Sequence, residues 1–311
     1  MNVIFFGSSA YSLPLISTLH DNFRLRSLIC KTSSQEIIQF ARQNKITLFT
    51  PRDVAQLLNV KKELSGKDIE LAVVADYGFI IPESVYNFPR LGTLNIHFSL
   101  LPMLRGPSPV QYTILFGYQT AGYCVIVTSD KIDAGNIIFK QSVPDIDPRQ
   151  ETQFSLYQKL FQHTAGKLPQ IFKDYEKGRL KKTKQDEKMA TFTRALTRQD
   201  GYIPISYLRK AQSGNEEELP NSGKDPAGSL ILQALQKDPR LPLVIERAIR
   251  AFNPWPSVWT LLFGKKRLKF HKAHLEKNQL APDLVQLEGK NPVSYKQFLE
   301  GYPQMKNQLH L

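Results

Sequence analysis

The sequence predicts an α/β protein: an open, mostly parallel Rossmann-like sheet followed by a smaller C-terminal domain that is β-rich and barrel-like. Over the first 120 residues, short apolar runs alternate with amphipathic segments, a pattern typical of strands that alternate with helices. Leu71–Ala75 is apolar at every position, as expected for a strand covered on both faces. We therefore expect helices on both sides of one large sheet in the first half of the chain.

Hydrophobic periodicity gives the expected elements in chain order. The predicted strands of the large sheet are Asn2–Phe6, Leu25–Cys30, Ile46–Phe49, Leu71–Ala75, Leu94–Phe98, Tyr123–Thr128 and Ile137–Val143, the last two antiparallel. The predicted helices follow Gly7-Ser8-Ser9 and Ser34, pass through Val54–Leu58, and cover Ser108–Phe116, Gln153–Tyr175 and Pro242–Ala251. Candidate strands of the C-terminal domain are Ser257–Phe263 and Arg267–Lys272.

Changes in composition divide the chain into three segments. We expect a first domain over residues 1–176, a basic linker over residues 177–200 and a C-terminal domain over residues 201–311. Within the last, residues 211–228 are rich in Gly, Pro, Asn and Glu, which predicts a mobile loop.

Composition excludes several classes of protein. The 311 residues include only two cysteines, Cys30 and Cys124, too few for a disulfide framework or a Cys-rich metal site. No window approaches the roughly 18 consecutive apolar residues of a membrane span, and Gly7-Ser8-Ser9 interrupts the first apolar run, unlike a secretory signal. We expect a cytoplasmic monomer without a metal and without membrane contact.

The positive charge is concentrated downstream. The chain carries 41 Lys and Arg against 28 Asp and Glu, a net charge of +13. Residues 1–165 have 15 basic and 13 acidic side chains, residues 166–200 have 10 and 5, and residues 241–311 have 11 and 5. Such an excess indicates a polyanionic partner, or else a solvated lysine face.

Alternation places three polar side chains on one face of the predicted strand within Leu94–Gly106 (LNIHFSLLPMLRG). Asn95, His97 and Ser99 share that face, while the apolar residues between them point to the other. Ligands bind at the carboxyl ends of strands in open α/β sheets. These side chains are therefore a candidate site; alternatively, Asn95 and His97 only form hydrogen bonds with a neighbouring loop.

A second polar feature strengthens this candidate site. Asp133 lies in the glycine-closed turn after the predicted strand Tyr123–Thr128, within reach of His97 from a neighbouring strand end. An imidazole that accepts a proton, a carboxylate that orients it and an amide that donates to an oxyanion together favour acyl transfer to an amine. Ser99 has no nucleophile-elbow context, which favours direct attack by a substrate amine.

Other motifs are missing or weak. The first strand–helix turn has one glycine, Gly7, so the GxGxxG dinucleotide fingerprint is not present. His271 and His274 lie three residues apart without a third ligand, and we do not expect a metal there.

These residues resemble the folate-dependent formyltransferases. Asn95-Ile96-His97, followed by Ser99–Pro102 and Arg105-Gly106, is similar to the catalytic segment of that family. Gly122–Gly135 (GYCVIVTSDKIDAG) is similar to its second signature, with Cys124 in place of the usual Ser, Thr or Met. The resemblance covers nearly the whole chain.

The resemblance implies transfer of a formyl group from 10-formyltetrahydrofolate to an amine. By this similarity, His97 would be the general base, Asn95 the oxyanion donor and Asp133 the residue that orients His97. The residues implied to border the folate are Ser99, Leu100, Leu101 and Pro102, together with Tyr77, Phe79, Ile80, Ile81 and Pro82 of the segment YGFIIP. Arg105 would contact an anionic group of the substrate or form a surface ion pair.

Within the family, the downstream segments favour members that formylate the methionyl group of initiator tRNA. Three segments resemble the linker and the C-terminal, tRNA-binding domain of those members: Ala190–Gly201, Arg250–Pro256 (RAFNPWP) and Val285–Lys290. The partner implied is therefore initiator methionyl-tRNA. The short passage Cys30–Ser34 lacks the basic, glycine-rich insertion usual in such members, which favours the alternative acceptor, an amino sugar nucleotide.

Overall fold

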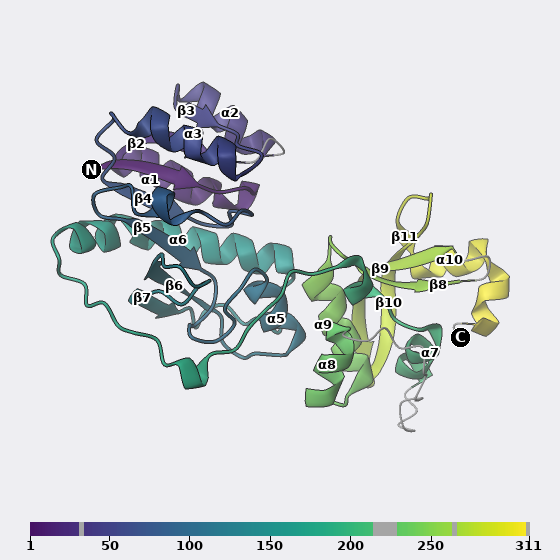
Figure 1. Ribbon diagram of the computed structural model, residues 1–311. Helices are drawn as coiled ribbons and strands as arrows, with labels where there is room; N and C mark the ends of the chain where they lie inside the picture. Colours follow the sequence, from purple (N-terminus) through teal and green to yellow (C-terminus); the bar gives the residue numbers. More distant parts are fainter. Residues whose placement is uncertain (31–33, 214–228, 263–265, 309–311) are drawn as a thin grey trace. The chain divides into compact units, whose positions relative to one another are not determined.

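A computed structural model describes residues 1–30, 34–213, 229–262 and 266–308 (Figure 1). Contacts within it divide the chain into two compact units. The first unit comprises Met1–Pro109, Ala121–Asp145 and Tyr157–Thr193, and the second comprises Val110–Thr120, Ile146–Leu156 and Arg194–Leu311.

A seven-stranded sheet forms the centre of the first unit, in the order β3-β2-β1-β4-β5-β6-β7. Its strands are β1 (Asn2–Phe6), β2 (Arg24–Ile29), β3 (Thr47–Phe49), β4 (Leu71–Val74), β5 (Thr93–His97), β6 (Gly122–Val127) and β7 (Ile137–Ser142). Strands β1 to β5 pair in parallel, and β6 and β7 pair antiparallel. The predicted mostly parallel sheet and its antiparallel edge are confirmed.

All but one of the α-helices before residue 200 lie where the pattern placed them (Figure 1). They are α1 (Leu13–Asn22), α2 (Gln35–Gln43), α3 (Val54–Leu64), α4 (Glu83–Tyr86), α5 (Pro109–Leu115) and α6 (Gln153–Glu176). Only the short α4 was not predicted. Ser34 takes the N-cap position of α2, but its hydroxyl donates to the carbonyl of Ser8 instead of capping the helix.

Aromatic and aliphatic side chains cover both faces of this sheet. On one face, Ile4 and Phe6 of β1 share a core with Leu57 of α3. On the other, the ring of Phe161 in α6 lies 4.4 Å from that of Phe98, just beyond β5. Burial on both sides explains the apolar strands and fixes the position of the end of β5, where the candidate site lies.

The second unit contains a small antiparallel sheet, as predicted, and more helix than expected. Its strands pair in the order β11-β10-β9-β8, with β8 (Val258–Leu261), β9 (Arg267–Glu276), β10 (Gln279–Leu287) and β11 (Val293–Ser294). Its helices are α7 (Ile205–Ser213), α8 (Leu230–Lys237), α9 (Leu241–Phe252) and α10 (Tyr295–Gly301). Of these, only α9 was predicted from the sequence.

Two expected features fall partly or wholly outside the described residues. Residues 31–33 of the short connection after β2 lie outside them, as do residues 214–228 of the expected loop, whereas residues 211–213 belong to α7. Within the ranges that the structure describes, no helix is long and apolar enough to cross a membrane.

The segment 183–193, expected to be part of the linker, lies along the first unit. Thr183 and Ile137 exchange two backbone hydrogen bonds of 2.9 Å each. Further along, the backbone N–H of Arg105 donates to Thr191 (2.9 Å), and that of Thr193 donates to Arg105 (2.7 Å). This segment therefore passes beside the loops that follow β5 and β6.

Candidate active site

A pocket of about 760 Å³ lies at the carboxyl end of β5 in the first unit. Four stretches of chain supply most of its lining: 76–83 after β4, 95–98 in and after β5, 106–109, and 128–133 after β6. The position is the one expected for a ligand site in an open α/β sheet.

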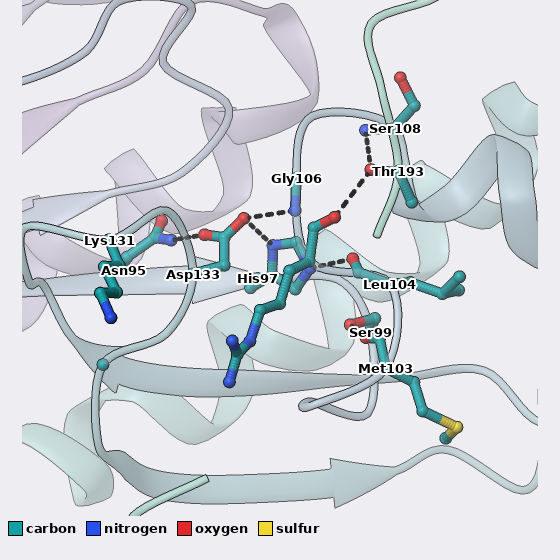
Figure 2. Close-up of polar contacts among 12 residues, drawn as sticks. Asn95, His97, Ser99, Met103, Leu104, Gly106, Ser108, Lys131, Asp133 and Thr193 are labelled. Atoms are coloured by element: carbon teal, nitrogen blue, oxygen red, sulfur yellow. Dashed lines mark hydrogen bonds and ion pairs between the residues drawn. The ribbon is translucent and has the colours of Figure 1, made fainter. Parts of the chain in front are cut away.

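The carboxylate of Asp133 is the centre of the polar contacts in this pocket (Figure 2). Its Oδ1 accepts a hydrogen bond from Asn95 Nδ2 at 2.9 Å. Its Oδ2 accepts one from the backbone N–H of Gly106 at 2.8 Å and lies 3.4 Å from His97 Nδ1. The structure thus brings together Asn95, His97 and Asp133, as the sequence predicted from two separate segments.

A tight turn after β6 carries Asp133 to this position. The residue has φ 51°, in the left-handed region that non-glycine residues seldom adopt. Gly135 closes the turn, and a Cβ there would lie only 1.7 Å from the carbonyl oxygen of Val127. Position 135 therefore requires glycine for steric reasons, which agrees with the glycine-closed turn predicted from the sequence.

The imidazole of His97 is buried, with 6% of its side chain exposed, and both ring nitrogens face acceptors. Nδ1 faces Asp133, and Nε2 lies 2.8 Å from the carbonyl oxygen of Leu104. Because a carbonyl oxygen only accepts, the Nε2 contact requires a hydrogen on Nε2. The ring is therefore held in a fixed orientation. To accept a proton at Nε2, the ring must leave Leu104 and carry its one hydrogen on Nδ1, where it faces Asp133.

Asn95 keeps one donor for a ligand. A primary amide carries two hydrogens, and Asp133 takes one of them. The second hydrogen lies on a side chain that lines the pocket, where it can donate to an oxygen that gains negative charge.

Apolar residues form one wall of the pocket. All of the sequence-predicted residues Tyr77, Phe79, Ile80, Ile81 and Pro82 line it. Ile80 is 77% exposed, and Ile132, in the stretch after β6 that also lines the pocket, is 64% exposed. Burial raises the pKa of the Tyr77 phenol to about 12, so it is neutral at physiological pH. Such a wall suits a flat heterocyclic ring.

The pocket is acidic although the chain as a whole is basic. Among the described residues, the carboxylates that line it are Asp76, Glu83, Asp130 and Asp133, against a single lysine, Lys131. This charge attracts an amine and repels a phosphate. A phosphorylated substrate therefore has to place its phosphates outside this pocket.

Five of the sequence-predicted residues do not line the pocket. Strand β5 ends at His97, so Ser99 leaves the alternating face, and its hydroxyl donates to the carbonyl of Met103 at 2.6 Å. Leu101 is fully buried beside Cys124 and Ile126. The structure does not bring Ser99, Leu100, Leu101, Pro102 or Arg105 to the pocket.

Arg105 forms an ion pair in which the guanidinium is buried and the carboxylate of Glu187 is largely exposed. Its side chain is 3% exposed, and its two terminal nitrogens each donate to Glu187 at 2.9 Å. Its Nε donates to Gln185 Oε1 at 3.0 Å. The guanidinium, interpreted from the sequence as a substrate contact or a surface ion pair, is thus engaged within the protein.

Sequence reasoning missed the backbone N–H of Gly106 and the amide of Gln185, which donates to the carbonyls of Asp133 and Gly135. The Arg105-Gly106 pair was noted, but a pattern of side-chain types does not indicate which backbone N–H groups donate hydrogen bonds. No group of three His, Cys, Asp or Glu that could hold a metal is found in the described part of the chain.

Comparison with known families gives two matches in order along the chain. The formyl transferase model matches residues 15–172, more than half of the chain, and the model of the formyl transferase C-terminal domain matches residues 243–283.

Two curated relatives are methionyl-tRNA formyltransferases. That of Fusobacterium nucleatum is 27% identical over 210 residues, 64% of this chain and 67% of that protein. That of Caldanaerobacter subterraneus is 26% identical over 286 residues, 88% of this chain and 81% of that protein.

Solved structures show the same fold in enzymes with different acceptors. Methionyl-tRNA formyltransferase from Clostridium thermocellum has a TM-score of 0.55 at 18% identity, covering 92% of this chain and 98% of that one. A sugar N-formyltransferase from a Shewanella species has a TM-score of 0.57 at 16% identity, covering 89% and 99%. From the family matches and the site that they span, we conclude that this chain is an enzyme and belongs to the formyl transferase family.

Proposed function

We propose that this enzyme transfers the formyl group of 10-formyltetrahydrofolate to the α-amino group of methionyl initiator tRNA. The convergence of Asn95, His97 and Asp133 on one pocket carries the proposal, because it supplies a donor, a proton acceptor and an orienting carboxylate for attack by an amine. The names of the curated relatives support tRNA as the acceptor.

The three side chains divide the chemistry between them. As the amine nitrogen attacks the formyl carbon, Asn95 donates its second amide hydrogen to the formyl oxygen, which gains negative charge. With its one ring hydrogen on Nδ1, facing Asp133, His97 gives up its contact with Leu104 and accepts at Nε2 the proton that the amine loses. Asp133 then stabilises the imidazolium. When the bond from the formyl carbon to the folate nitrogen breaks, His97 returns the proton to that nitrogen.

The apolar wall suits the folate ring. Residues 77–82 and the exposed side chain of Ile132 offer aliphatic and aromatic contacts on the rim of the pocket. We assign the ring to this wall and give Ser99–Pro102 the supporting role of shaping the turn after β5, since none of these four residues lines the pocket.

The acidic pocket suits the amino group of an aminoacyl-tRNA, and the basic remainder of the chain suits its phosphates. The pocket attracts the amino group, while the excess of basic residues in 166–200 and 241–311 suits RNA phosphates. We therefore assign catalysis to residues 1–176 and contact with tRNA to the linker 177–200 and the domain 201–311. We propose that the enzyme acts as a monomer in the cytoplasm.

A second acceptor is an amino sugar nucleotide. The short connection Cys30–Ser34 favours it, because members that act on tRNA usually carry a basic insertion at that point. The shared fold does not separate the two, since both kinds of enzyme match the chain over most of its length.

A direct assay decides between the acceptors. The purified protein is mixed with 10-formyltetrahydrofolate and either methionyl-tRNA or an amino sugar nucleotide, and release of tetrahydrofolate and the mass of the acceptor are measured. We expect formylated methionyl-tRNA, with an affinity that falls steeply as salt rises because bound counterions are released. Formylation of the sugar alone, or a flat salt dependence, would contradict the tRNA assignment.

A further inference from the structure

A buried amide side chain supports the loop that carries Asp133 from outside the pocket. Gln185 is 5% exposed, and its Nε2 lies 2.8 Å from the carbonyl oxygen of Asp133 and 2.8 Å from that of Gly135. A primary amide has two hydrogens, so each carbonyl receives one. Gln185 therefore satisfies two backbone groups of the turn that holds the catalytic carboxylate.

The same amide connects the turn to the opposite side of the carboxylate. Its Oε1 accepts a hydrogen bond from Arg105, the residue before Gly106. The N–H of Gly106 donates to Asp133 Oδ2. Gln185 is thus connected to Asp133 by two routes. It donates directly to the backbone carbonyl of Asp133, and it is linked through Arg105 and Gly106 to the carboxylate.

Glu187 fixes the guanidinium in this chain of contacts. It accepts two hydrogen bonds of 2.9 Å from Arg105, a paired geometry that sets the plane of the guanidinium. The hydrogen bonds from Arg105 lower the pKa of Glu187, which keeps its carboxylate ionised.

The segment that carries Gln185 is held on both sides. Before it, Thr183 pairs with Ile137 of β7 through two backbone hydrogen bonds. After it, Thr191 and Thr193 bond to the backbone of Arg105. The backbone on both sides of Gln185 is therefore fixed to the first unit, and the residue does not lie on a free connecting segment.

We propose that Gln185 is a positioning residue for formyl transfer, which holds Asp133 in line with His97 through this chain of contacts. The turn needs such a support because Asp133 adopts a left-handed backbone conformation that relaxes unless its surroundings hold it. Loss of Gln185 leaves two carbonyls without their donor and frees the carboxylate to leave Nδ1 of His97. The inference rests on the proposed transfer chemistry and holds for either acceptor.

The first test separates positioning from a general loss of stability. Gln185→Met keeps the length of the side chain and removes its hydrogen bonds. We expect kcat to fall about 10- to 100-fold, with the KM for the formyl donor unchanged. Gln170→Met is the matched control, because Gln170 is exposed on α6 and contacts only Asp174 among the bonds described. Wild-type kcat in Gln185→Met would overturn the proposal.

A double-mutant cycle identifies the residue through which Gln185 acts. If Gln185 works through Asp133, then Gln185→Met causes no further loss of kcat in an Asp133→Asn background. Independent, multiplying losses would show a structural role only. Glu187→Gln serves as a second variant: the side chain is 63% exposed, and glutamine keeps an oxygen that accepts a hydrogen bond from Arg105. We expect a fall in kcat of about two- to fivefold, also absent in Asp133→Asn.

A spectroscopic measurement keeps this inference separate from the proposed function. In full-length protein labelled with ¹⁵N-histidine, the ring nitrogens of His97 report on its carboxylate partner without any turnover. We expect Gln185→Met to shift them in the same direction as Asp133→Asn, and Gln170→Met to leave them unchanged. Unshifted His97 signals in Gln185→Met overturn the positioning role, whereas failure of the wild type to formylate either acceptor overturns only the proposed function.

Discussion

The carboxylate of Asp133 lies 3.4 Å from Nδ1 of His97, with only 11% and 6% of the two side chains exposed. A charge pair in such a dry setting is screened less than one at the surface. Because Nε2 of the same ring contacts Leu104, the imidazole has one orientation, and the carboxylate is placed to stabilise positive charge on it.

Removal of either partner should slow formyl transfer severely without unfolding the protein. We expect His97→Ala and Asp133→Ala to lower kcat by about 10²- to 10⁴-fold, the usual contribution of a positioned proton acceptor. Formyl transfer is measured by release of tetrahydrofolate, and folding by circular dichroism. His20→Ala and Asp145→Ala, at exposed positions away from the pocket, are the matched controls. Near-normal turnover in either site variant would refute the mechanism.

Asn95 should contribute to the rate and not to binding of the formyl donor. Its free amide hydrogen meets negative charge only as the formyl oxygen is attacked, so Asn95→Ala should lower kcat about 10²- to 10³-fold and leave KM nearly unchanged. Steady-state kinetics with varied formyl donor make the distinction, and Asn44→Ala, exposed at the end of α2, is the control. A raised KM with an unchanged kcat would show that Asn95 binds the ground state instead.

The sheet and the centre of the site were predictable because both follow from local patterns. Alternation along β5 put Asn95 and His97 on one face, and glycine at position 135 marked the turn that presents Asp133. The same alternation failed at Ser99, because the strand ends two residues earlier and no pattern within the strand marks that end.

Contacts between distant segments were not predictable from the sequence. The bonds from Gln185 to Asp133 and Gly135 join positions far apart in the chain, within a stretch whose polar composition indicated a linker. In the second unit, α7 and α8 flank residues 214–228, whose composition masked the helical periodicity of their neighbours.

Gly106 should resist substitution more than any ordinary surface glycine. It has φ +109°, and a Cβ there would lie 2.4 Å from the carbonyl oxygen of Thr193. We expect Gly106→Ala to lower the free energy of unfolding by about 1–3 kcal/mol and to reduce kcat, because its N–H moves away from Asp133. In Gly66→Ala, where a Cβ meets nothing within 4 Å, the change should stay within about 0.5 kcal/mol. Equal melting temperatures for the two variants would refute the steric argument.

The acid sensitivity of the second unit should depend on Asp238. Its carboxylate accepts hydrogen bonds from Arg240 and Arg247, each at 2.8 Å, and these hold its pKa at about 2, below the ordinary value of 3.8. A carboxyl whose folded pKa is lowered stabilises the fold above its unfolded pKa. That contribution, about 2 kcal/mol, is lost as the pH falls from about 4 to about 2.

Asp238→Asn tests this directly. Both tryptophans, Trp255 and Trp259, lie in the second unit, so urea unfolding followed by their fluorescence reports on that unit. The difference in unfolding free energy between wild type and Asp238→Asn should be largest at neutral pH and shrink below pH 4, because the protonated carboxyl loses its advantage over an amide. Asp145→Asn, at an exposed carboxylate, should show no such trend. A difference that stays constant from neutral pH down to about pH 3 would mean that Arg240 and Arg247 contribute nothing through the charge of Asp238.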